Sequence, residues 1–414
     1  MRNRHLMRAM ILLLASFGMT DAVAAKSCSP AWVPTWASSQ MLPTGDNALP
    51  KGVLGAATLR QVVRTSAAGQ KLRIRLSNIA SSEPLRISGV TVARSSDPAS
   101  SAIKIETLRP VLFDGQRDVQ IPAGAEYLSD PVALAPAALE SLVISIHHAE
   151  EPATQTSHPG ARATSYVLPG DHLNDPAMPG AKTFDHWFTL ASVETETCAP
   201  AGAIVALGDS ITDGRGATTD GNDRWTDGLA ARLQADRRLR HLAVLNQGIG
   251  GNRLLKDGLG PNALARLDRD VLAQPGARYL ILLEGINDIG TLTRDAPASD
   301  AAHRQLVFRM IGAYRQIVER ARARGIKVIG ATILPFMGNA YYHPDARNEA
   351  DRQAVNQWIR EPGNFDAVVD LDKATRDPAR PDRLRPEYDS GDALHPSPAG
   401  YRAMADAIPL RLFD

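Results

Sequence analysis

Five mainly apolar runs in the second half of the sequence constrain its fold most. They span residues 203–207, 242–245, 279–283, 328–333 and 367–371. Strands that are apolar on both faces are typical of a parallel sheet covered by helices on each side. Helix-like stretches separate and follow these runs, at 225–239, 262–272, 303–324, 347–358 and 398–410. The alternation predicts a doubly wound α/β sheet of about five strands, with its ligand site at the carboxyl ends of the strands.

The residues from about 30 to 196 show a different pattern, in which apolar and polar residues alternate. Leu72, Ile74 and Leu76 are separated by arginines, and similar runs lie at 85–92 and 141–146. Gly and Pro turns punctuate these short runs, which favours an all-β sandwich or jelly roll without long helices. A chain of 414 residues suits two domains. We therefore expect a β domain over residues 26–199 and an α/β domain over 200–414.

The amino terminus has the features of a secretory signal peptide. Three arginines within the first eight residues precede an apolar run at 9–18, and small residues at 22–25 offer a cleavage site. The alternative is a buried amino-terminal helix. Neither the run at 9–18 nor any later segment is long enough to span a bilayer, so no membrane insertion is expected. The prediction is a protein secreted to the periplasm or the extracellular medium, with residues 1–25 removed.

Cys28 and Cys198 are the two cysteines of the chain. An even number of cysteines in an exported protein favours one disulfide bond. Two free buried thiols are the alternative.

The charge of the mature chain excludes a strongly charged partner. Removing residues 1–25 takes three Arg and one Asp from 46 basic and 45 acidic residues, which leaves 43 and 44 and a net charge of −1. A nearly neutral protein lacks the basic surface that binds nucleic acid or anionic membranes. A neutral or weakly charged substrate is expected, and the sequence leaves the oligomeric state open.

Four short segments contain candidate catalytic residues, three of them just after predicted strands. Their sequences are Gly208-Asp209-Ser210 after the first apolar run, Asn246-Gln247-Gly248-Ile249-Gly250-Gly251-Asn252 after the second, Gly285-Ile286-Asn287-Asp288 after the third, and Asp392-Ala393-Leu394-His395-Pro396 before the last helix. A serine hydroxyl needs a base to attack an ester, and a histidine three residues from an aspartate can serve. Taken singly, each residue has an ordinary interpretation: a helix cap, a turn residue or a surface histidine.

Together the four segments resemble the motifs of the SGNH (GDSL-type) hydrolases. The resemblance covers residues from about 202 to 414 and implies a flavodoxin-like sheet and a carboxylic ester hydrolase. It implies a catalytic triad of Ser210, Asp392 and His395. It also implies an oxyanion hole formed by the Ser210 N–H, the Gly251 N–H and the Asn287 amide, donors that each contribute a few kcal/mol. Ile286 departs from the commoner Gly-Gly-Asn-Asp motif but leaves Asn287 in place.

The whole chain, including Thr35-Trp36-Ala37-Ser38, resembles most the secreted arylesterases and acylhydrolases that accompany hemicellulose degradation. That resemblance implies short acyl esters, plausibly acetyl groups on plant polysaccharides, as substrates, with no cofactor and no metal. Two other functions stay open: a lipid esterase or lipase, and a catalytically inactive carbohydrate-binding surface protein. Asp213 and Arg215 either line the site or are loop residues, whereas Trp187 and Trp225 are expected in the core rather than against a sugar.

Overall fold

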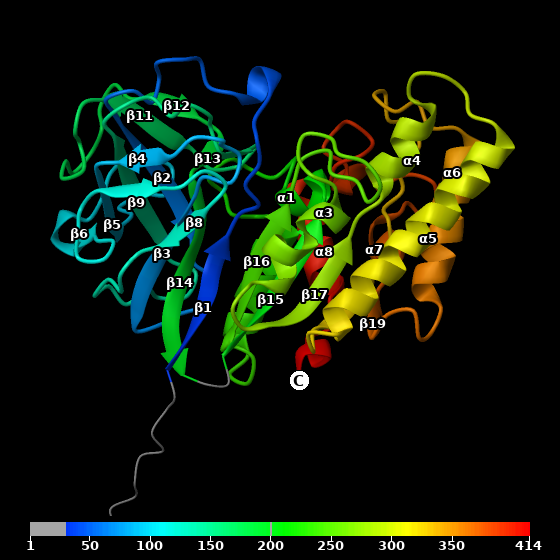
Figure 1. The fold of residues 1–414 in the computed structure, drawn as a ribbon. Coiled ribbons are helices and arrows are strands. Elements are labelled where there is room, and N and C mark those ends of the chain that lie inside the picture. Colours follow the sequence, from blue (N-terminus) through cyan, green and yellow to red (C-terminus); the bar gives the residue numbers. More distant parts are fainter. Residues whose placement is uncertain (1–29, 199–200) are drawn as a thin grey trace, which may run out of the picture.

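The computed structural model describes residues 30–198 and 201–414, which form a β-rich part and an α/β part (Figure 1). We refer to 30–198 as the β domain and to 201–414 as the α/β domain. The predicted signal peptide at 1–25 lies outside the described residues. So do Cys28 and the side chain of Cys198, so the predicted disulfide stays a prediction.

A five-stranded parallel sheet forms the centre of the α/β domain. Its strands are β15 (Gly202–Gly208), β16 (Leu242–Gly248), β17 (Ala277–Leu283), β18 (Lys327–Ala331) and β19 (Ala367–Val369). Across the sheet they lie in the order β16-β15-β17-β18-β19, and every neighbouring pair is parallel. This is the flavodoxin-like order, and it confirms the predicted doubly wound fold. In such a sheet the ligand site lies where the strand order reverses, between β15 and β17.

Helices cover both faces of this sheet. They are α1 (Ser210–Asp213), α2 (Trp225–Ala235), α3 (Ala263–Leu267) with a π-helical turn (Asp268–Leu272), α4 (Ile286–Thr293), α5 (Asp300–Arg322), α6 (Ala346–Arg360), α7 (Leu371–Thr375) and α8 (Pro398–Ala407). Along the chain, the connection from β15 to β16 moves across the sheet in one direction, and the connections to β17, β18 and β19 move in the opposite direction. Because such crossover connections are right-handed, α2 lies on one face of the sheet and α3, α5 and α6 lie on the other. Accordingly α2 packs on α8, and α5 packs on α3 and α6.

Several boundaries differ from the sequence-based expectation. The fifth strand ends at Val369 because Asp370 caps α7 by accepting a hydrogen bond from Lys373 N at 3.1 Å. Helix α2 ends at Ala235 rather than at residue 239. Helix α4 was not expected, because its first turn contains Asn287 and Asp288, which are turn-forming residues. Its tertiary contacts with α5 and α6 hold it in place.

The β domain is a sandwich of two antiparallel sheets, as predicted. One sheet has the order β1-β14-β3-β8 and the other β12-β11-β2-β9-β5-β6. The strands are β1 (Pro30–Ala37), β2 (Ala57–Arg64), β3 (Lys71–Ser77), β5 (Gly89–Arg94), β6 (Arg109–Val111), β8 (Glu126–Leu128), β9 (Ser141–His148), β11 (Ser165–Pro169), β12 (Lys182–Phe184) and β14 (Leu190–Cys198). Two small pairs join β10 (Ser157–Pro159) to β13 (His186–Phe188) and β4 (Leu85–Ile87) to β7 (Val119–Ile121). The helical turns here are 3₁₀ segments at Gly45–Asn47 and Ile105–Thr107.

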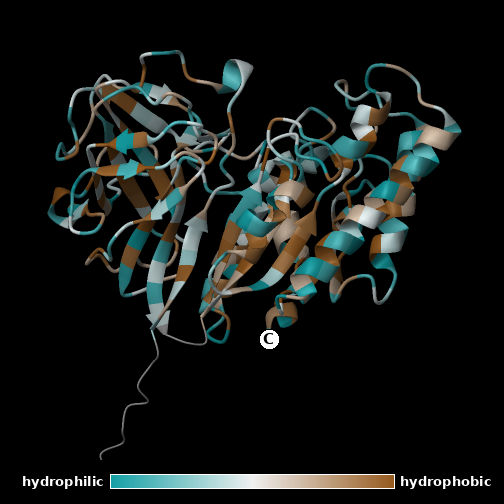
Figure 2. Ribbon diagram, in the orientation of Figure 1, coloured by the Kyte–Doolittle hydropathy of each residue, from teal (hydrophilic) through white to brown (hydrophobic). Residues whose placement is uncertain are grey.

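The core of the sandwich is built from the alternating apolar residues. Leu72, Ile74 and Leu76 of β3 are fully buried and pack in one cluster with residues of β5 and β9 from the opposite sheet. In Figure 2 the strands of the sandwich carry mixed colours, whereas the strands of the parallel sheet are more evenly brown. Trp187 lies in the core of the sandwich and Trp225 in the core of the α/β domain, as expected for both.

The two domains share a packed interface. Val33 and Ala37 of β1, together with Ala67, belong to the same apolar cluster as the core of the α/β domain. Ser66 Oγ accepts a hydrogen bond from Val244 N in β16 at 3.0 Å, and β1 lies beside β16 in Figure 1. The β domain is therefore fixed against the edge strand of the sheet that carries the predicted site. Within residues 30–198 and 201–414, no helix has the length and apolar character needed to cross a membrane.

Candidate active site

Ser210 lies at the carboxyl edge of the sheet, at the switch point between β15 and β17. Asp209 caps helix α1 by accepting a hydrogen bond from Ile211 N at 2.9 Å, which leaves Ser210 as the first helical residue. The first N–H groups of a helix have no partner within the helix, and no residue that the structure describes accepts from Ser210 N. A side chain on Gly248 would lie 2.2 Å from Asp213 N, so only glycine lets α1 pack this closely on the end of β16.

His395 contacts Ser210 directly and is held by Asp392. Ser210 Oγ lies 2.8 Å from His395 Nε2, and His395 Nδ1 lies 2.6 Å from Asp392 Oδ2. Asp392 Oδ1 also accepts the backbone N–H of His395 at 2.8 Å. Partial burial acts to raise the pKa of Asp392, but the hydrogen bonds from His395 outweigh it and lower that pKa well below its usual value. Asp392 is therefore ionised at neutral pH, and its hydrogen bond to Nδ1 fixes the ring so that Nε2 faces the serine.

Gly251 and Asn287 bring further donors to the same cleft. Gly251 has a left-handed backbone with φ of +68°, which glycine adopts without strain. Its N–H has no hydrogen-bond acceptor within the described chain. Asn287 lies in the first turn of α4, where its Nδ2 donates to Asn252 O at 2.8 Å. One N–H of that amide group is thus occupied and the second is available. The structure brings Ser210, Gly251, Asn287, Asp392 and His395 together as walls of one cleft of about 860 Å³.

Tyr342 orients the Asn287 amide group, a role that no sequence motif predicts. The Tyr342 hydroxyl donates a hydrogen bond to Asn287 Oδ1 at 2.6 Å. Burial raises the pKa of Tyr342 well above its usual value, so the hydroxyl keeps its proton and remains a donor. With the amide oxygen bound on one side, the amide nitrogen must face Asn252 and the cleft. Tyr342 lies 55 residues from Asn287 in sequence, so no local pattern signals this contact.

Arg266 connects the chain segments that carry the candidate donors. It is fully buried, and it donates to Gly208 O at 2.9 Å, to Gln247 O at 2.6 Å and to Asn252 Oδ1 at 2.8 Å. These contacts join the end of β15, the end of β16 and the loop that contains Gly251. The sequence gives no distinct signal for this role, because Arg266 is one of two arginines in a helix stretch that also contains Asp268 and Asp270. Asp270 Oδ2 forms an ion pair with Arg266 Nη1 at 3.0 Å, which compensates the buried charge of the arginine.

Buried carboxyl groups lie next to the motif residues. Burial raises the pKa of Asp209 to about 7 and the pKa of Asp288 to about 6. Burial also raises the pKa of Glu284. Asp288 accepts the backbone N–H groups of Leu254 at 2.8 Å and Leu255 at 3.0 Å, which holds the loop after Gly251. Raised pKa values reduce the negative charge near a site where an anion would form.

Asp213 faces the β domain, and no hydrogen bond or ion pair joins it to His395 in the part of the chain that the structure describes. Its Oδ1 lies 2.9 Å from His158 Nε2, and His158 Nδ1 lies 2.9 Å from the backbone oxygen of Ser39. His158 also stacks on Trp187, with ring centroids 5.6 Å apart. Arg215, by contrast, is exposed and lines the cleft. Both residues therefore line hollows beside Ser210: Asp213 lines a smaller pocket next to the serine, and Arg215 lines that pocket as well as the large cleft.

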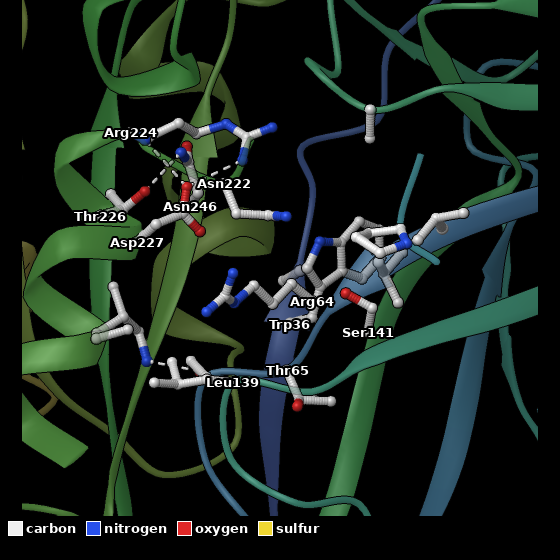
Figure 3. A pocket seen from close by; sticks show the side chains of 18 of the residues that line it. Trp36, Arg64, Thr65, Leu139, Ser141, Asn222, Arg224, Thr226, Asp227 and Asn246 are labelled. Carbon is white, nitrogen blue, oxygen red and sulfur yellow. Dashed lines mark hydrogen bonds and ion pairs between the residues drawn. The ribbon is translucent and has the colours of Figure 1, made fainter. Parts of the chain in front are cut away.

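A second, smaller cavity lies between the two domains. Figure 3 shows Arg224, Thr226 and Asn246 of the α/β domain across from Trp36 and Arg64 of the β domain. Its volume is about 50 Å³, roughly that of one or two water molecules. Ser210 does not line this cavity. The cavity is therefore a gap in the packing between the two domains, separate from the cleft around the serine.

A doubly wound sheet with a hydroxyl, an imidazole and a carboxylate in contact at its carboxyl edge is the arrangement of a serine hydrolase, a class that includes the carboxylic ester hydrolases. Comparison with known proteins agrees. Residues 206–403 match the GDSL-like Lipase/Acylhydrolase family. The protein is accordingly a carboxylic ester hydrolase. No curated protein matches the chain.

Solved structures of similar proteins cover about half of the chain. An acetylxylan esterase from Geobacillus stearothermophilus, solved as a catalytic mutant, is 25% identical with a TM-score of 0.38, over 51% of this chain and 93% of that one. A GDSL-like lipase from Bacteroides thetaiotaomicron is 19% identical with a TM-score of 0.34, over 50% of this chain and 84% of that one.

Proposed function

We propose that this protein hydrolyses short acyl esters, acetyl esters in particular, with Ser210 as nucleophile, His395 as general base and Asp392 as the residue that orients the histidine. The observation that carries the proposal is the continuous contact from Ser210 Oγ through His395 to Asp392, at 2.8 and 2.6 Å. A nucleophile, a base and an orienting carboxylate within hydrogen-bond reach are the parts that acyl transfer needs.

The reaction follows from these positions. Ser210 Oγ bonds to the ester carbonyl carbon as its proton passes to His395 Nε2. The carbonyl oxygen becomes an oxyanion, which the Ser210 N–H, the Gly251 N–H and the free N–H of Asn287 stabilise. The bond to the alcohol then breaks, and His395 returns the proton to the leaving oxygen. Water next attacks the acyl-serine with His395 again taking a proton, which releases the acid and restores Ser210.

The walls of the large cleft favour a carbohydrate as the alcohol part. The cleft is open to solvent and carries polar side chains such as Arg253, Asp257 and Asn339. Tyr341 at its edge is 58% exposed and presents an aromatic ring of the kind that stacks on sugars. Esters on plant polysaccharides are therefore the substrates that we propose.

The test is hydrolysis of a chromogenic acetate ester, followed by acid release from acetylated xylan, pectin and xyloglucan. Ser210→Ala should reduce kcat by at least about a thousandfold, as loss of a triad serine does. Ser96→Ala, in an exposed loop of the β domain, is the matched control and should retain full activity. If the wild-type protein hydrolyses no acetyl ester, or if Ser210→Ala remains active, the proposal is wrong.

We further propose that the protein is secreted, with a mature chain that begins near residue 26 and comprises domains 26–199 and 200–414. The basic start, the apolar run and the small residues at 22–25 support this proposal. Amino-terminal sequencing of the protein recovered outside the cytoplasm tests it. An intact first residue in that fraction would contradict it.

A further inference from the structure

The proposed reaction fixes where each part of the ester must lie around Ser210, and the inference below rests on that proposed function. The carbonyl oxygen must point to the N–H groups of Gly251 and Asn287. The leaving oxygen must lie near His395 Nε2, which gives it a proton. The acyl substituent, as the remaining group on the carbonyl carbon, must therefore extend from Ser210 away from both His395 and Asn287.

Two hollows meet at Ser210, and they differ in which of these residues they contain. The large cleft contains His395, Asn287 and Gly251. A smaller pocket of about 180 Å³ contains Ser210 and Gly250 but none of those three residues. We propose that this smaller pocket, called here the acyl pocket, holds the acyl group, while the large cleft holds the alcohol part.

The β domain builds the far wall of the acyl pocket. Met41, Asn47, His158, Pro159 and Gly160 of that domain line it, facing Ile249 of the α/β domain. The active site is therefore complete only when both domains are present. This gives the β domain a role in substrate selection in addition to any role in stability.

Hydrogen bonds fix this wall at its distance from Ser210. Met41 and Ser157 exchange two backbone hydrogen bonds, at 2.8 and 3.0 Å. His158 joins Ser39 O to Asp213, which lies three residues after Ser210 in helix α1. Because this wall is hydrogen-bonded to helix α1, which also carries Ser210, the distance between the wall and the nucleophile is fixed, and so is the depth of the pocket.

The size and chemistry of the pocket suit a short acyl group. A water molecule has about 30 Å³ of liquid volume, so the pocket holds about six groups of that size. Both ring nitrogens of His158 are already bound. Met41 and Ile249 present buried apolar side chains, but the charged Arg162, Asp185 and Arg215 also line the pocket, so its apolar surface is small. We expect acetyl to butyryl groups to fit, and chains of about eight carbons to be excluded.

The experiment compares kcat/KM for p-nitrophenyl acetate, butyrate and octanoate in the wild type and in two variants. Met41→Ala enlarges the pocket and should raise the butyrate-to-acetate and octanoate-to-acetate ratios about tenfold, since one methylene in a pocket changes selectivity by about 10–200-fold. Leu42→Ala, at the exposed neighbouring residue, is its control. Asn47→Trp narrows the pocket and should lower the butyrate-to-acetate ratio by a similar factor. Asp46→Trp, on the exposed side of the same 3₁₀ turn, is its control.

The outcomes separate this inference from the proposed function. Opposite shifts in Met41→Ala and Asn47→Trp, with unchanged ratios in both controls, support the acyl pocket. Wild-type acyl preferences in both variants, with acetate hydrolysis intact, overturn the acyl pocket and leave the esterase proposal standing. Asn47→Trp changes a half-exposed side chain without hydrogen-bond partners among the described residues, so it remains informative if Met41→Ala does not fold. A wild-type protein without activity on any of the three esters would refute both.

Discussion

Replacing Tyr342 with Phe tests whether the orientation of the Asn287 amide group controls the reaction. The substitution removes one hydroxyl, which donates to Asn287 Oδ1 at 2.6 Å, and keeps the buried ring. Without that donor the amide group can rotate and present its oxygen to the oxyanion. A hydrogen bond of this type contributes about 1 kcal/mol, and 1.36 kcal/mol corresponds to about tenfold in rate. We therefore expect kcat to fall about five- to tenfold while KM stays unchanged.

Two further variants bracket this expectation. Asn287→Ala removes the donor itself and should lower kcat by about 10²–10³. Tyr314→Phe is the matched control, because Tyr314 is also buried and its hydroxyl donates at 2.6 Å to a backbone oxygen, that of Glu284. Tyr314→Phe should lower the midpoint of thermal unfolding by about as much as Tyr342→Phe does, but it should leave kcat near that of the wild type. Steady-state kinetics on the chromogenic acetate ester, with thermal melts of each variant, decide the question. Equal kcat for Tyr342→Phe and Tyr314→Phe would refute the reasoning.

Three other predictions concern charge and covalent structure. Asp392→Asn should lower kcat at every pH, but by less than His395→Ala does, and a pH–rate profile of each variant measures this difference. Because the pKa of Asp209 is raised to about 7, the folded protein holds a proton that an unfolded Asp loses near pH 3.9, so the free energy of unfolding should fall from pH 4 to 7 by up to about 4 kcal/mol. Asp209→Asn keeps the helix cap and should make the free energy of unfolding, measured by urea titration, nearly independent of pH in this range. If the variant shows the same pH dependence as the wild type, Asp209 is not the group responsible. Cys28 and Cys198 should be disulfide-bonded, with a stabilisation of about 4 kcal/mol, and two free thiols in a denaturing, non-reducing titration would exclude the bond.

The sequence by itself determined the class of the fold and the order of the candidate site residues. A parallel strand buried on both faces is apolar throughout, as at residues 203–207, whereas a sandwich strand is apolar on one face and alternates, as at residues 72–76. The local pattern of apolar residues therefore indicates the type of sheet. The carboxyl ends of parallel strands meet at one edge, which groups Ser210, Gly251 and Asn287 without knowledge of side-chain contacts. Asp392 and His395 are three residues apart, so their contact is also nearly local.

Only the tertiary structure decided which residues support that site and which domain completes it. Tyr342 orients Asn287, Arg266 joins two strand ends, and His158 of the β domain binds Asp213 beside the nucleophile. The partners in these contacts are 55, 58 and 55 residues apart in sequence. A side chain that serves a distant partner leaves no periodic or motif signal in its own neighbourhood, so it resembles an ordinary core tyrosine, helix arginine or loop histidine. The wall that the β domain contributes beside Ser210 is of the same kind, because it exists only once the two domains pack against each other.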